Sequence, residues 1–265
     1  MFCRSRHQLS SAKQNPRVIV TKSTSTSNSL AARQQNSMKR KSLFENRENE
    51  TTGEMAFRRV RSDIIRGHLK PGQKLRLDQL KSQYGVAVST LREILSRLTA
   101  EEFVVAEGQR GFEVASVSES GLRDIAALRL LLETQALRQS IASGDLQWEA
   151  RVVSSHYILQ SIESKLVEGD LTHVEQWIQQ DWEFHQATIS ACESPAMMAA
   201  HSTAFDRYIR YHMLAMSFRG EAAAKEHAQL KDLVLARKTE AAISLLTSHV
   251  QSGLKHVLST GKIPK

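Results

Sequence analysis

Apolar residues recur every three or four positions in two consecutive short segments, which predicts two small helices joined by a tight turn. In the first segment, Leu77 and Leu80 form one apolar face. In the second, the apolar stripe consists of Leu91, Ile94, Leu95 and Leu98. Gly85 lies between the segments and can adopt the positive φ of a tight turn. Thr90 and Glu93 have the spacing of a capping box, which predicts that the second helix begins there.

Two short helices around a glycine turn are typical of a helix-turn-helix, whose second helix enters the major groove of DNA. The apolar segments 103–106 and 112–115 flank a Gly-Gln-Arg-Gly turn and predict a small β-hairpin, the wing. We therefore expect a winged helix-turn-helix that contacts DNA. Its candidate DNA-binding residues are Ser89, Thr90 and Arg92 at the start of the second helix and Arg110 at the wing tip.

From about Ser118 the pattern is helical to the end of the chain, without a useful alternating strand signal. Turn residues occur at Gly144-Asp145, Gly169-Asp170 and Ser194-Pro195. The intervening segments of about 15 to 25 residues predict an all-α bundle of about six or seven helices. The predicted fold is mainly α, an N-terminal winged helix-turn-helix followed by an all-α helical bundle.

These patterns divide the 265 residues into a basic tail, 1–53, a DNA-binding domain, 54–115, and a helical domain, 118–258. The tail has a net charge of +7 and no hydrophobic period, so we expect it to be disordered. It is interpreted as a basic arm that adds non-specific DNA affinity, or as an over-long start with initiation at Met38 or Met55. Its acid-poor, Arg/Ser-rich composition also resembles a mitochondrial transit peptide.

Charge and composition support this division. The DNA-binding domain carries +3 and the remainder −2, of a total of +8, so phosphate attraction is confined to the N-terminal part. Two cysteines indicate a reducing compartment rather than a disulfide framework. No apolar run approaches the roughly 18 residues of a membrane span. We expect a cytoplasmic protein that associates with chromosomal DNA when it is bound.

Four residues of the helical domain form a candidate metal site. Asp181 and His185 are four residues apart, on one helix face, and His227 and His249 follow. Three imidazoles and one carboxylate suit a divalent Zn, Ni or Mn ion with open positions for water or ligand. The alternative is that His227 and His249 are unrelated surface residues, because the chain has ten histidines.

Arg129 lies on a strongly apolar helix that the sequence predicts to be buried nearly all round. A buried guanidinium needs an anionic partner. That partner is either Glu133, four residues later, or the carboxylate of a bound effector whose other end reaches the metal. We expect His201, His212 and His256 to be ordinary residues without a role in a site.

Residues 71–114 resemble, without a gap, the winged helix of GntR-family bacterial transcription regulators. The positions in register are Pro71-Gly72, Leu75, Leu80, Gly85-Val86, Leu91-Arg92-Glu93, Leu95, Leu98, Val104, Gly111 and Val114. Ala87-Val88 replaces the frequent Ser-Arg, so one usual base-reading arginine is missing, and Glu102 replaces the frequent glycine before the wing. These departures indicate an unusual operator rather than a different fold.

Residues 118–258 resemble the FCD ligand-binding domain that follows this winged helix in the FadR subfamily. The resemblance rests on four short motifs: Arg129 to Glu133, Asp181 to His185, His227 to Leu230 and Ala242 to His249. It implies a metal held by Asp181, His185, His227 and His249, with Arg129 binding the effector. The implied effector is a small organic acid or sugar acid.

The sequence therefore predicts a transcriptional repressor, not an enzyme, that binds a double-stranded palindromic operator as a homodimer and responds to a small carboxylate effector. The effector would act through the linker at 116–119 by changing the spacing of the two recognition helices. One alternative is a metal-dependent hydrolase with an attached DNA-binding domain, which would need a general base beside the metal. Another is an architectural DNA-binding protein, for which a ligand cavity is superfluous.

Overall fold

The computed structural model describes residues 50–108, 111–216 and 218–265. Its first helix, α2, spans Thr52–Ile65 and begins with a capping box. The Thr51 hydroxyl accepts a hydrogen bond from the Glu54 backbone N–H, and the Glu54 carboxylate accepts one from the Thr51 N–H. A chain that started at Met55 would lack this cap and the first turn of α2.

The predicted helix-turn-helix is present as α3, Leu77–Tyr84, and α4, Val88–Ala100. Gly85 ends α3 with φ 69°, the left-handed conformation expected of the turn glycine. The predicted capping box at Thr90 is wrong, because α4 begins earlier and has Ala87 as its N-cap. Thr90 therefore lies inside the first turn of the helix. The apolar stripe of α4 is buried as predicted.

The predicted wing is a hairpin of β2, Val104–Ala106, and β3, Phe112–Val114. A strand that the sequence pattern did not predict, β1, Lys74–Leu75, pairs with the other edge of β3. The result is a three-stranded antiparallel sheet in the order β1-β3-β2.

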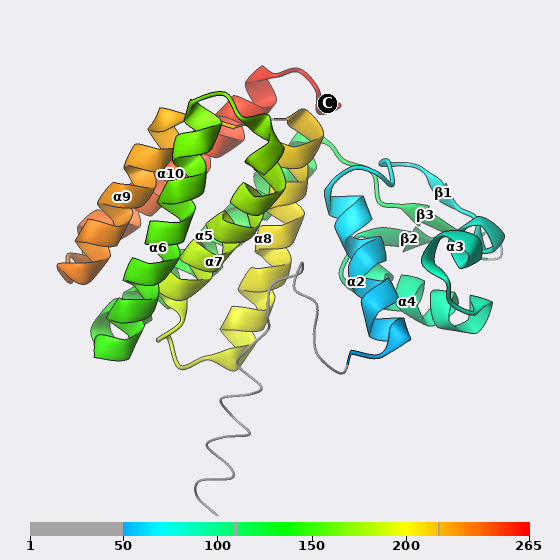
Figure 1. Ribbon diagram of the computed structural model, residues 1–265, viewed down its shortest axis with the longest axis horizontal. Coiled ribbons are helices and arrows are strands. Elements are labelled where there is room, and N and C mark those ends of the chain that lie inside the picture. Colours follow the sequence, from blue (N-terminus) through cyan, green and yellow to red (C-terminus); the bar gives the residue numbers. More distant parts are fainter. Residues whose placement is uncertain (1–49, 109–110, 217) are drawn as a thin grey trace, which may run out of the picture. The chain divides into compact units, whose positions relative to one another are not determined.

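Within the described residues, the part of the chain after the wing forms six α-helices, in agreement with the predicted bundle, and they run side by side in Figure 1. Their bounds are α5 Glu119–Ser143, α6 Leu146–Val167, α7 Val174–Ile189, α8 Pro195–Ala215, α9 Glu221–Leu235 and α10 Thr239–Ser259. A short 3-10 helix, η2, Leu171–His173, precedes α7.

Two of the predicted turn residues cap helices. Asp145 caps α6 by accepting a hydrogen bond from the Trp148 N–H, and Ser194 caps α8, which has Pro195 in its first turn. No turn residue of this kind marks the end of α8 in the sequence. Its C-cap is Met216, which adopts the left-handed conformation with φ 50°, uncommon for a residue other than glycine.

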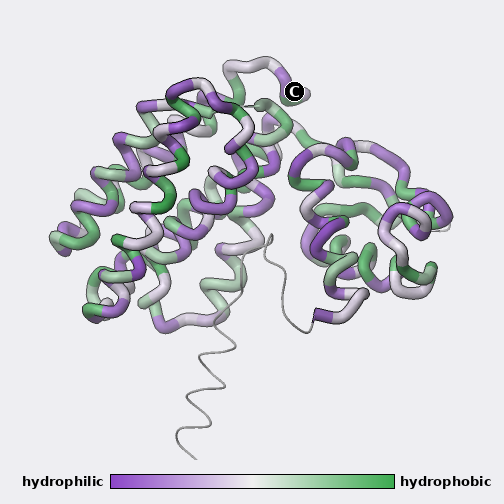
Figure 2. Tube along the Cα trace, in the orientation of Figure 1, coloured by the Kyte–Doolittle hydropathy of each residue, from purple (hydrophilic) through white to green (hydrophobic). Residues whose placement is uncertain are grey.

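The bundle core is continuous, but α5 is not buried on all sides. Leu122, Ile125 and Ala136 are buried, whereas Leu131 is 69% exposed. The prediction that this helix is buried nearly all round is therefore wrong. Figure 2 shows hydrophobic and hydrophilic residues interspersed along the bundle helices.

Three polar side chains of helix α8 contact residues that lie between the start of α2 and the linker at 116–119. Asp206 forms an ion pair with Arg61 of α2 at 2.8 Å, and Arg207 pairs with Glu102 at 2.8 Å. Arg210 donates a hydrogen bond to the Ala115 carbonyl, just before the linker, at 2.6 Å. Among the described residues, no helix is long and apolar enough to cross a membrane.

Candidate metal centre

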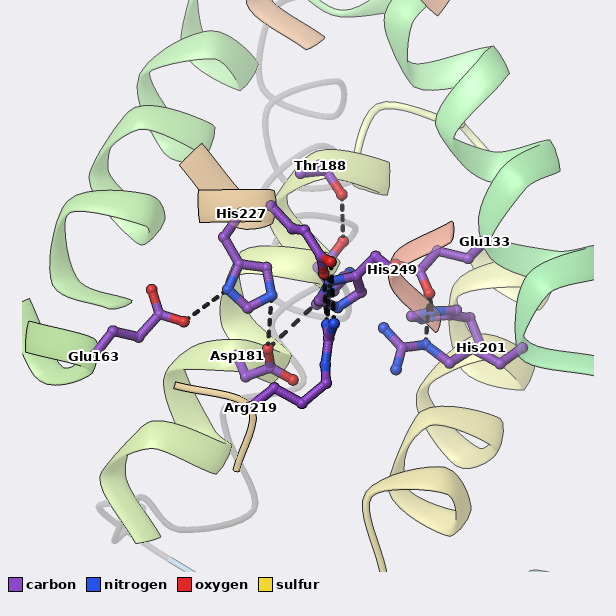
Figure 3. A network of polar contacts seen from close by, with 11 residues as sticks. Glu133, Glu163, Asp181, Thr188, His201, Arg219, His227 and His249 are labelled. Carbon is purple, nitrogen blue, oxygen red and sulfur yellow. Dashed lines mark hydrogen bonds and ion pairs between the residues drawn. The ribbon is translucent and has the colours of Figure 1, made fainter. Parts of the chain in front are cut away.

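The four predicted metal ligands come from three helices and are all buried. Asp181 and His185 lie one turn apart on α7, His227 is on α9 and His249 is on α10. Figure 3 shows the labelled side chains of Asp181, His227 and His249 lying close together. The alternative of unrelated surface histidines is therefore wrong.

The distances within this cluster suit one shared ion. Asp181 Oδ1 lies 3.2 Å from His227 Nε2 and 3.8 Å from His185 Nε2. One nitrogen from each of the three histidines lies within 4.8 Å of the corresponding nitrogens of the other two. The cluster can therefore present three nitrogens and one carboxylate oxygen to a metal ion.

A glutamate from another part of the fold contacts Nδ1 of each imidazole. His185 Nδ1 is 2.5 Å from Glu133 Oε1, and His227 Nδ1 is 2.7 Å from Glu163 Oε1. His249 Nδ1 is 2.7 Å from Glu226 Oε2. An imidazole that donates Nδ1–H to a carboxylate has its Nε2 lone pair free for a metal. The three glutamates thus favour the tautomer that a metal site requires.

The protonation of the cluster follows from its burial. Burial lowers the pKa of His249 to about 3, so this ring is neutral near neutral pH. Burial acts in the same direction on His227, but the nearby carboxylates of Asp181 and Glu163 outweigh it and raise the pKa of His227 to about 9. Burial would raise the pKa of Asp181, yet the close contact with His227 and the charge of His185 hold this pKa well below its usual range.

A second observation indicates that these four side chains fit a metal ion. Nε2 of His185 and Nε2 of His227 are buried, and neither has a geometrically good hydrogen-bond partner in the described part of the chain. Buried polar atoms are almost always satisfied, and coordination would satisfy both of these. Three imidazoles and a carboxylate are the ligands that borderline divalent metals accept.

A cavity of about 30 Å³ adjoins the cluster. Its wall includes Asp181, His227 and His249 together with Arg129, Tyr208 and Arg219. Arg129 Nε donates to Glu133 Oε2 at 2.8 Å, so the first of the two predicted partners of Arg129 is present. Its guanidinium also lies over the rings of Phe205 and Tyr208, and its Nη2 is buried without a hydrogen-bond partner among the described residues. Arg129 therefore retains a free donor beside the cavity.

Comparisons with known proteins identify the family of this chain. Residues 52–114 match the model of bacterial regulatory proteins of the gntR family, and residues 124–252 match the FCD domain. The HTH-type transcriptional regulator BphR of Paraburkholderia xenovorans is 39% identical over 210 residues, which cover 78% of this chain and 86% of BphR. The chain belongs to the GntR family.

Further relatives of this GntR-family regulator support the same assignment. The HTH-type transcriptional repressor GlaR of Escherichia coli is 33% identical over 73% of this chain and 90% of GlaR. The solved structure of E. coli McbR/YncC has the same fold, with a TM-score of 0.67, 21% identity and coverage of 80% and 99% of the two chains. The protein is a transcriptional regulator with a GntR DNA-binding domain and an FCD effector-binding domain, and its relatives are regulators rather than enzymes.

The sequence pattern missed several residues of this site. The regulator's His201 and His212, predicted to be ordinary, are buried: His201 Nε2 lies 3.1 Å from Glu133 Oε2, and His212 lines the cavity. Arg219, between α8 and α9, donates two hydrogen bonds to Glu226, and its Nη2 lies 3.0 Å from His249 Nδ1. The contacts of His201 with Glu133 and of Arg219 with His249 join residues far apart in sequence, so no local spacing signals them.

Three of the four candidate DNA-binding residues lie on α4, as predicted. Ser89 and Arg92 of α4 are exposed, and Thr90 is half-buried. Arg110 lies outside the described residues, so its predicted place at the wing tip is not described.

Proposed function

We propose that this regulator is a metal-containing repressor whose operator binding is controlled by a small carboxylate. The observation that carries this proposal is the buried convergence of Asp181 with three histidines beside a cavity that contains Arg129. GntR-family regulators usually act as dimers on DNA, and we infer that this protein binds its palindromic operator as a homodimer. The name of GlaR, a repressor, supports repression as the mode of action.

The proposed metal is divalent Zn, Ni or Mn, held by Asp181, His185, His227 and His249. Bound there, the ion would supply a Lewis-acidic site for an anionic oxygen of the effector. Arg129 Nη2 would donate to the effector carboxylate, while Nε stays on Glu133. The free space of about 30 Å³ suffices for two or so water-sized groups, which favours entry of a carboxylate head group rather than a bulky ligand.

The hydrolase alternative needs a carboxylate free to act as general base beside the metal. Glu133, Glu163 and Glu226 are the glutamates nearest the three imidazoles, and each is already engaged by one of them. This arrangement favours a binding site over a hydrolytic one. Consumption of an added acid or ester by the metal-loaded protein would favour the hydrolase.

Gly253 of α10 provides a test of the effector cavity that leaves every proposed ligand in place. A Cβ added at Gly253 would lie 2.6 Å from Tyr208 Oη and 3.3 Å from His212 Cε1, both on residues of the cavity wall. Overpacking of this kind costs about 1–3 kcal/mol of folding stability. Side chains of the cavity wall must shift to relieve it, so Gly253→Ala should weaken effector binding. Its metal content should equal that of wild type.

The measurement is operator binding, followed by fluorescence anisotropy on a site selected from random DNA, with acetate, glycolate and succinate as probes. At least one acid should release wild-type protein from DNA at a concentration at which Gly253→Ala remains bound. Gln251→Ala, at an exposed position two residues earlier on α10, leaves the proposed ligands in place and controls for changes on this helix. The effector proposal is wrong if no carboxylate alters operator binding or thermal stability of the metal-loaded wild type.

A second prediction concerns DNA reading. If Arg92 contacts a base, Arg92→Ala should weaken operator binding by about 1–3 kcal/mol, or roughly 5- to 150-fold, while affinity for unrelated DNA falls much less. Arg123→Ala, at an exposed position of α5, removes the same charge from the effector domain and should change neither affinity. An equal loss on operator and unrelated DNA would assign Arg92 to phosphate contact instead.

A further inference from the structure

The three glutamates behind the imidazoles differ in how their charges are balanced. Glu133 forms an ion pair with Arg129 at 2.8 Å, and Glu226 forms one with Arg219 at 2.6 Å. Glu163 of α6 has no such partner: within the described residues its only ion pair is with His227. The acid on His227 is therefore distinct from the acids on His185 and His249.

Glu163 is also deeply buried. Its exposed fraction is 1%, and its second oxygen, Oε2, has no hydrogen-bond partner in the part of the chain that the structure describes. When His227 is neutral, as metal coordination requires, a buried carboxylate beside it is costly, because burial removes the hydration that stabilises the negative charge. A positive charge close to Glu163 would offset this cost.

Asp181 is the other carboxylate of the cluster that forms no ion pair with an arginine or lysine among the described residues. Glu133 with Arg129, and Glu226 with Arg219, are neutral pairs. Asp181 and Glu163 together therefore leave two negative charges, which equals the charge of one divalent cation. Asp181 would contact the ion directly. Glu163 would act indirectly, through the hydrogen bond of 2.7 Å between its Oε1 and Nδ1 of His227.

We propose that Glu163 is a positioning residue of the metal site: it fixes His227 with Nε2 toward the ion and supplies the second negative charge that makes the site neutral when a divalent metal is bound. This inference rests on the proposed metal binding. It separates the three glutamates by role, since Glu133 and Glu226 orient their histidines without adding net charge. Figure 3 shows Glu163 on one side of the cluster and Glu133 on the opposite side.

Glu163→Gln tests the charge, because glutamine has the same shape and its amide oxygen still accepts a hydrogen bond from Nδ1–H. We expect the Kd for Zn²⁺ to rise about 10- to 100-fold, the effect typical of an outer partner of a ligating histidine. Glu163→Asp keeps the charge and should recover most of the affinity. Glu168→Gln, at the exposed C-cap of the same helix, removes an equal charge and should bind Zn²⁺ like wild type.

The experiment is a Zn²⁺ titration of the metal-free, full-length proteins in competition with a chromogenic chelator, with thermal melting of each metal-free protein beside it. Wild type that takes up no Zn²⁺, Ni²⁺ or Mn²⁺ would overturn the proposed function itself. Wild type that binds Zn²⁺ while Glu163→Gln binds it equally well would overturn only the role of Glu163. Equal weakening in Glu163→Gln and Glu163→Asp, with metal-free melting temperatures lowered alike, would assign Glu163 a structural role and contradict the inference.

Discussion

His249→Ala is expected to lose most of the metal that the wild-type protein holds. His249 is one of three imidazoles in the cluster, and its ring centroid lies 4.7 Å from that of His227. Removal of a direct ligand should cost more than the roughly 10- to 100-fold that loss of an outer partner costs. We therefore expect affinity for Zn²⁺ to fall by at least about 100-fold, measured by elemental analysis and competition titration.

This variant is a cleaner test than one at His227. Without His249, Glu226 still has its ion pair with Arg219, so no isolated charge remains in the core. Without His227, Glu163 would lose its only ion-pair partner among the described residues. His256→Ala, seven residues after His249 on α10, is the matched control and should keep the full metal content. Equal metal content in all three proteins would rule out His249 as a ligand.

Arg61→Ala is expected to be the most destabilising substitution considered for the fold. Arg61 is 4% exposed, and its guanidinium contacts Glu101 at 2.6 Å and Asp206 at 2.8 Å. Burial raises the pKa of Asp206 even with Arg61 beside it, so the carboxylate depends strongly on this cation. Removing one partner of a buried ion pair typically costs about 3–5 kcal/mol. We expect a loss of this size in the free energy of unfolding, measured by urea denaturation.

A double variant separates lost charge pairing from lost packing. Arg61→Met with Asp206→Leu replaces the buried pair by apolar side chains and should recover most of the stability, because a well-packed apolar replacement is often neutral. Arg151→Ala, at an exposed position of α6, should change stability by less than about 0.5 kcal/mol. A double variant as unstable as Arg61→Ala would contradict the electrostatic explanation.

The local parts of the fold were predictable from the sequence because they depend on short-range rules. The turn at Gly85, the caps at Asp145 and Ser194 and the six-helix bundle follow from residue preferences and hydrophobic period. The start of α4 was misplaced, because Thr90 and Glu93 fit a capping box while Ala87 makes no side-chain cap that a pattern could detect. Strand β1 has only two residues, too few for any period to appear.

For the metal site, the sequence predicted the four proposed metal ligands but not the contacts of the residues around them. Asp181 and His185 share one helix, and the family resemblance added His227 and His249. Glu163 and Glu226 have no sequence signal, because each contacts a histidine of another helix: Glu163 lies 64 positions before His227. Glu133 was identified only as a partner of Arg129, and its contact with His185 was not predicted. Packing of the whole bundle brings them together, so their roles follow from the structure alone.

Helix α8 contacts both the surroundings of the metal site and helix α2, which bears on effector binding in the presence of DNA. Its His201 contacts Glu133, which holds metal-site His185, and its Asp206 contacts Arg61 of α2. If α8 couples the two regions, thermodynamic reciprocity applies: an effector that lowers operator affinity tenfold must itself bind ten times more weakly to the operator-bound protein. In a cell, the number of operator sites would then influence the concentration of acid at which the regulator responds.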